Sequence, residues 1–135
     1  MELNVTYQGG VKFEAETRGH RLVSDQPVDK GGADVGMTPP ELLLASLGTC
    51  AAYYAVEYLM VRGLDTNDVR IRVTAEKKLQ PARLADFKIE VEAPSMTGSR
   101  HYELMLRTVQ RCLVHTTLTH PSEVEVAIRQ PVTMG

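Results

Sequence analysis

Two cysteines, Cys50 and Cys112, are the residues of this 135-residue chain that most readily suggest chemistry. A cysteine thiolate is a nucleophile, and oxidation takes it to a sulfenic acid and then, with a second thiol, to a disulfide. A free cysteine is also a common small apolar residue of protein cores. Both cysteines occur in apolar segments, "SLGTCAAYY" and "RCLVHTTL", so the residues alone leave open a reactive pair or two core residues.

A metal or nucleotide site is not predicted. Cys112 and His115 are three residues apart and could share one side of a helix end, but a zinc site needs further ligands, and no C-x-x-C or H-x-x-x-H is present. His115 is instead expected to close a helix C-terminus, where positive charge is favoured. The glycine-rich segment 27–37 lacks the spacing of a phosphate-binding loop, so we expect no bound cofactor.

The charge balance and the apolar segments limit the possible partners. Fifteen basic and seventeen acidic residues give a net charge of −2, which argues against nucleic-acid binding. The first residues lack the pattern of a signal peptide, and the apolar run 42–56 is interrupted and flanked by Glu41 and Glu57. A membrane span needs about 20 mostly apolar residues. We therefore expect a cytoplasmic protein with no membrane partner. In that compartment we expect two cysteines to be reduced, catalytic or metal-binding rather than a structural staple.

The segment that carries Cys50 has the clearest pattern of a helix. Thr38 and Glu41 form a capping-box pattern around Pro39, and Gly63 is a natural stop. The helix would be about 24 residues long, roughly 36 Å. Its apolar residues cover most of its faces, so it must be surrounded by protein. One small chain cannot surround it, and this predicts a homodimer.

The remaining segments predict strands and a second helix. Apolar and polar residues alternate in 3–7 and 11–15, on either side of Gly9-Gly10, and again in 69–73, 87–91 and 123–130. Residues 99–114 have the pattern of an amphipathic helix that ends near Cys112. The predicted order is ββ-α-ββ-α-β, which is a single α+β domain over residues 1–135.

Three segments together resemble the OsmC/Ohr family over nearly the whole chain: "GGADVGMTPPELLLASLGTCAAYYAVEYL", "RCLVHTTL" and the terminal "EVEVAI". The resemblance implies an OsmC-like fold and an intertwined homodimer. In such a dimer the long central helices are sandwiched between sheets, and the active sites lie at the subunit interface.

The resemblance also implies an activity, namely thiol-dependent reduction of organic hydroperoxides in oxidative or osmotic stress defence. By position, Cys50 matches the peroxidatic cysteine and Cys112 the resolving cysteine. The first would become a sulfenic acid and the second would condense with it to a disulfide. A dithiol reductant of the lipoyl type would then restore both thiols.

Two positions depart from the peroxidase branches of the family. Those branches place an Arg just after the first-hairpin glycines, where this chain has Val11 and Lys12. They open the helix with Asn-Pro-Glu, where this chain has Pro40 in place of the Glu, and Glu41 is about 100° further around the helix. The sequence therefore resembles the general OsmC-like branch more closely. We name Glu41 with Arg18, or alternatively Arg21, as the candidate pair that activates Cys50.

Two other functions fit the same residues. The chain could be a non-enzymatic OsmC-like dimer that binds a small apolar or thiol-containing ligand at the subunit interface. It could also be a purely structural dimer in which both cysteines are unreactive core residues.

Overall fold

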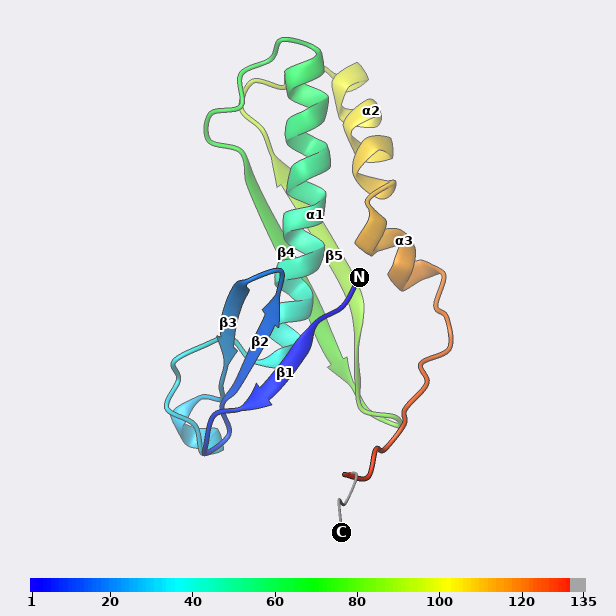
Figure 1. Cartoon of the computed structure of the whole chain (residues 1–135). Coiled ribbons are helices and arrows are strands. Elements are labelled where there is room, and N and C mark those ends of the chain that lie inside the picture. The colour runs from blue at the N-terminus through cyan, green and yellow to red at the C-terminus, as the bar shows by residue number, and fades with distance from the viewer. Residues whose placement is uncertain (132–135) are drawn as a thin grey trace.

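The computed structural model describes residues 1–131 and has the α+β architecture that the sequence predicts (Figure 1). Its elements, in chain order, are β1 (Asn4–Tyr7), β2 (Phe13–Thr17), β3 (His20–Ser24), the short 3-10 helix η1 (Val28–Lys30), α1 (Pro39–Val61), β4 (Arg70–Lys78), β5 (Arg83–Glu92), α2 (Ser99–Gln110) and α3 (Leu113–Thr119).

The N-terminal sheet is antiparallel, in the order β1-β2-β3. Val5 is opposite Ala15, and Ala15 is opposite Leu22, so the alternating apolar residues share one face of the sheet. The hairpin predicted around Gly9-Gly10 is confirmed. A third strand, β3, follows the tight turn at Arg18 and Gly19 and was not predicted from the sequence.

Helix α1 begins where its capping residues predict. The Thr38 hydroxyl accepts the Glu41 backbone N–H, and the Glu41 carboxylate accepts the Thr38 backbone N–H. By length and composition alone α1 could cross a membrane. In the fold, however, β4, β5, α2 and α3 pack against it. The packed side is marked by its buried residues, which are Leu47, Ala51, Ala55, Tyr58 and Leu59.

The second sheet is the β4–β5 hairpin, which lies along α1 on one side of the core (Figure 1). Val73 is opposite Ile89, and this alternating register turns apolar residues of both strands toward the helix. Met105 and Val109 of α2 complete the same core cluster. The sheet and α2 therefore hold the part of α1 that carries Cys50.

Two predictions about the C-terminal part of the chain are wrong in detail. The helix expected over 99–114 is two helices, because the chain takes an extended conformation at Cys112, which lies between them. The strand expected over 123–130 is absent, although Val124, Val126 and Ile128 alternate as predicted and are 81–88% exposed. A strand needs a neighbour for its backbone hydrogen bonds, and this segment has none within residues 1–131.

The loop before α1 is organised around one buried carboxylate. Asp25 is 1% exposed and accepts backbone N–H groups from Gln26, Ala33 and Val35. The backbone packs so closely that a Cβ on Gly32 would collide with the Gln26 carbonyl. The glycine-rich segment therefore serves to fold tightly around Asp25 and to lead the chain into α1.

Candidate functional site

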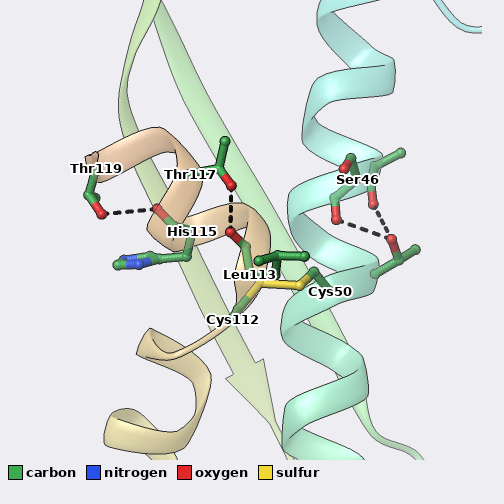
Figure 2. The surroundings of a disulfide bond; sticks show 9 residues. Ser46, Cys50, Cys112, Leu113, His115, Thr117 and Thr119 are labelled. Carbon is green, nitrogen blue, oxygen red and sulfur yellow. Dashed lines mark hydrogen bonds between the residues drawn. A yellow bond between two sulfur atoms is a disulfide. The ribbon is translucent and has the colours of Figure 1, made fainter. Parts of the chain in front are cut away.

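The two cysteines are joined by a disulfide between the middle of α1 and the start of α3 (Figure 2). Cys50 and Cys112 are 62 residues apart in sequence, and their Cα atoms are 5.9 Å apart. That separation is within the usual range for a disulfide. The fold thus brings together the two sulfur atoms that the sequence could relate only through a family resemblance.

Cys112 is fixed by the break between the last two helices. Its N–H donates to the Val109 carbonyl at 3.0 Å, and its carbonyl accepts the Thr116 N–H at 2.9 Å. It is therefore the N-cap residue of α3, with a φ of −53° and a ψ of 134°. This local geometry ends α2, starts α3 and directs the Cys112 side chain toward α1.

The two cysteines differ in accessibility. Cys112 is fully buried, at 0% exposed, whereas Cys50 is half-buried on the surface of α1. Ser46, one turn before Cys50, is exposed (Figure 2). A molecule that approaches from solvent can therefore reach the Cys50 side of the bridge more easily than the Cys112 side.

Glu41 is occupied at the start of α1. Its Oε1 accepts the Thr38 N–H at 2.9 Å and the Thr38 hydroxyl at 2.8 Å. These two bonds, the backbone one first, hold the pKa of Glu41 below its ordinary value. Nine residues separate Glu41 from Cys50, about 13.5 Å along a helix. Within the chain Glu41 is thus a capping residue.

Arg18 lies in the turn between β2 and β3, where its side chain is exposed beside a hollow formed with residues 1–4. Arg21, the alternative, has its Nε 3.4 Å from a Glu16 carboxylate oxygen and 3.8 Å from one of Glu14. In the part of the chain that the structure describes, no ion pair joins Arg18 or Arg21 to Glu41. One subunit therefore does not assemble the activating pair that was predicted from the sequence.

Two polar residues that sequence reasoning did not assign correctly are Asp25 and His115. Burial opposes ionisation of Asp25, but its three N–H bonds and the charge of Lys12 keep its pKa below the ordinary value of 3.8.

His115 does not close a helix, because α3 continues to Thr119 and is capped by His120. His115 instead lines a cavity, and its Nδ1 is buried without a hydrogen-bond partner. Over residues 1–131, no group of His, Cys, Asp or Glu side chains is arranged to hold a metal ion.

Comparisons with known proteins identify the family of the chain. A family model described as OsmC-like protein matches residues 31–127, which is well over half of the chain. A search of curated proteins gave no match.

Solved structures resemble the whole fold. A Psychrobacter arcticus protein, described as an osmotic stress induced and detoxification response protein, has a TM-score of 0.78 at 23% identity over 88% of each chain. An OsmC-like protein from Mycoplasma pneumoniae has a TM-score of 0.73 at 18% identity over 89% of this chain and 87% of its own. An organic hydroperoxide resistance protein OsmC from Legionella pneumophila has a TM-score of 0.59 at 17% identity, over 89% and 90% of the two chains. These structures share the fold of the chain, and the family match shows that the chain belongs to the OsmC-like protein family.

Proposed function

We propose that this protein is a thiol-dependent peroxidase that reduces organic hydroperoxides through Cys50 and Cys112, in defence against oxidative or osmotic stress. The observation that carries the proposal is the disulfide between these two cysteines. A peroxidase of this kind passes through such a disulfide in every cycle. The Legionella pneumophila relative, an organic hydroperoxide resistance protein, supports the substrate class.

In the first step the Cys50 thiolate attacks the terminal oxygen of the hydroperoxide. An S–O bond forms and the O–O bond breaks; the alkoxide that leaves takes up a proton and departs as an alcohol. Cys50 is thereby oxidised by two electrons to a sulfenic acid. The greater accessibility of Cys50 supports its assignment as the cysteine that hydroperoxide oxidises first.

In the second step the Cys112 sulfur attacks the Cys50 sulfur. The S–S bond forms, and hydroxide leaves and takes up a proton to become water. Two thiols and one hydroperoxide thus give one disulfide, one alcohol and one water. A small dithiol, of the lipoyl type, then reduces the disulfide by thiol–disulfide exchange and is itself oxidised to its cyclic disulfide.

The sheet β1–β3 and helix α1 support a homodimer as the working form. One face of the sheet borders α1 across an open apolar hollow. This face carries four apolar side chains that are each 42–58% exposed, namely Leu3, Val5, Phe13 and Leu22. Tyr53 and Met60 of α1 are 67% and 68% exposed. Apolar surface on this scale is typical of an interface. We propose that a second copy covers it, and that the dimer acts in the cytoplasm.

Arg18 is proposed as the cation that lowers the pKa of the Cys50 thiol in the dimer, with Glu41 as its carboxylate partner. A cation beside a thiol favours the thiolate, and each unit by which the pKa falls gives about tenfold more thiolate below the pKa. Arg18→Ala is then expected to slow the oxidation of Cys50 by roughly tenfold at neutral pH. Arg21→Ala tests the alternative candidate: slower oxidation in Arg21→Ala, with a wild-type rate in Arg18→Ala, would assign the role to Arg21 instead.

The proposed function is tested by counting thiols. Fully reduced protein is mixed with one equivalent of cumene hydroperoxide, and the remaining thiols are titrated. The wild type is expected to lose two thiols for each hydroperoxide consumed, and Cys50→Ser is expected to lose none on the same timescale. Persistence of both thiols in the wild type would reject the peroxidase. If the wild type loses its thiols and Arg18→Ala loses them at the same rate, only the role of Arg18 is rejected.

A further inference from the structure

The two ends of the disulfide differ in what can reach them from solvent. Cys112 is 0% exposed, whereas Cys50 is half-buried. Exposed residues flank Cys50 along α1, with Ser46 one turn before it (Figure 2) and Tyr53 about one turn after it. Solvent therefore reaches the Cys50 end of the bridge and not the Cys112 end.

This difference matters for the step that restores the two thiols. In thiol–disulfide exchange an attacking thiolate bonds to one sulfur of the bridge, and the other sulfur leaves with the electron pair. The rate depends on which sulfur the thiolate can contact. Cys112 offers no surface for that contact. Attack on its sulfur would first require α3 to move away from α1, against which it packs.

The choice of leaving group works in the opposite direction, but it is the weaker effect. A buried thiolate is generally a poorer leaving group than an exposed one. This slows an attack on Cys50, because the buried Cys112 sulfur must then leave. A slow attack on a reachable sulfur is still faster than an attack on a sulfur that no outside molecule touches.

Dimer formation does not reverse the difference between the two sulfurs. A second copy that packs on the chain can only cover surface, so it cannot expose Cys112. The backbone of Cys112 is also fixed, because its N–H donates to the Val109 carbonyl and its carbonyl accepts the Thr116 N–H. The order of accessibility therefore holds for one subunit and for an assembly of two.

We infer that the reducing dithiol attacks the Cys50 sulfur and forms a mixed disulfide with Cys50. The bond to Cys112 breaks, and the Cys112 sulfur takes the electron pair and a proton. The second thiolate of the dithiol then attacks the dithiol's own first sulfur, which closes its cyclic disulfide and releases Cys50 as a thiolate. Two electrons pass from the dithiol to the two cysteines.

The inference rests on the proposed function and deepens it, because it names the sulfur at which the reductant acts. Cys50 then reacts with both outside molecules, the hydroperoxide and the dithiol. Cys112 reacts only with Cys50, inside the protein.

Trapping the mixed disulfide with a monothiol tests the inference. The bridge is formed with diamide, and the folded protein is mixed briefly with 2-mercaptoethanol, which cannot close a ring. Acid stops the exchange, N-ethylmaleimide added with denaturant labels the free thiol, and peptide mass spectrometry locates both groups. We expect mercaptoethanol on Cys50 and maleimide on Cys112 at least about tenfold more often than the reverse arrangement.

The same exchange in urea is the matched control, because an unfolded chain exposes both sulfur atoms. There the two arrangements should be equally frequent to within a few-fold. The inference is overturned if the folded protein carries mercaptoethanol mainly on Cys112 or equally on both cysteines. It is also overturned if only the unfolded protein reacts. Since no hydroperoxide is used, this result is separate from the thiol count that tests the peroxidase.

Discussion

The disulfide between Cys50 and Cys112 ties helix α3 to the middle of α1. Helix α3 has no fully buried residue of its own, so it contributes little to the core. The residue just before it, Cys112, is fully buried and bonded to α1. The same bond that marks the proposed redox centre therefore also holds the last helix in place.

Reduction of this bond should lower the stability of the fold. The disulfide connects residues 62 apart, and closing a loop of that length stabilises a protein by about 4 kcal/mol in the chain-entropy model. Urea unfolding of the oxidised protein and of the same protein in excess reductant measures the difference. A free energy of unfolding that is unchanged by reductant would contradict this role.

Asp25 should make stability depend on pH. Its pKa is lowered in the folded protein, so it stabilises the fold above the ordinary aspartate value of 3.8 and loses this effect as pH falls through the lower folded value. Asp25→Asn would place amide hydrogens against the N–H groups of Ala33 or Val35. We expect a lower unfolding midpoint for this variant at neutral pH, and a difference from wild type that shrinks below pH 3.8.

The control for Asp25 is Asp29→Asn, in the exposed 3-10 helix of the same loop. Its unfolding midpoint should follow that of the wild type at every pH. Equal midpoints for Asp25→Asn and wild type at neutral pH would show that the buried carboxylate does not organise the loop.

The exposed face of the N-terminal sheet should be a dimer interface. Val5→Lys places a charge among Leu3, Phe13 and Leu22, so it is expected to convert a dimer into a monomer in light scattering coupled to size exclusion. Thr6→Lys is the matched control, because Thr6 is on the opposite face of the same strand, across from Glu14. A wild-type monomer, or a Val5→Lys dimer as stable as the wild type, would contradict the proposed assembly.

The start of α1 could be predicted from sequence because its signals are local. Thr38, Pro39 and Glu41 are neighbours in the chain, and their hydrogen bonds need nothing from elsewhere. The strands that flank glycine turns could be predicted for the same reason. The break at Cys112 could not, because neither Gly nor Pro occurs in "QRCLV" to announce it.

The parts that sequence reasoning missed depend on distant residues. Asp25 is one acid among many until the fold brings Ala33 and Val35 to it. His115 borders a cavity whose walls come from three regions of the chain. The alternation in 123–130 predicts a strand that the structure does not form, because a strand also needs a partner, and none lies within residues 1–131.

The central claim is that Cys50 is the sulfur that hydroperoxide oxidises first. The most direct measurement uses reduced Cys112→Ser, in which a sulfenic acid on Cys50 cannot be resolved to the disulfide. The protein is treated with one equivalent of cumene hydroperoxide and then with dimedone, and the adduct is located by peptide mass spectrometry. The account predicts a dimedone adduct on Cys50, and no adduct on Cys112 in the matched Cys50→Ser variant. An unmodified Cys50 in folded Cys112→Ser, after the hydroperoxide has had time to react, would contradict it.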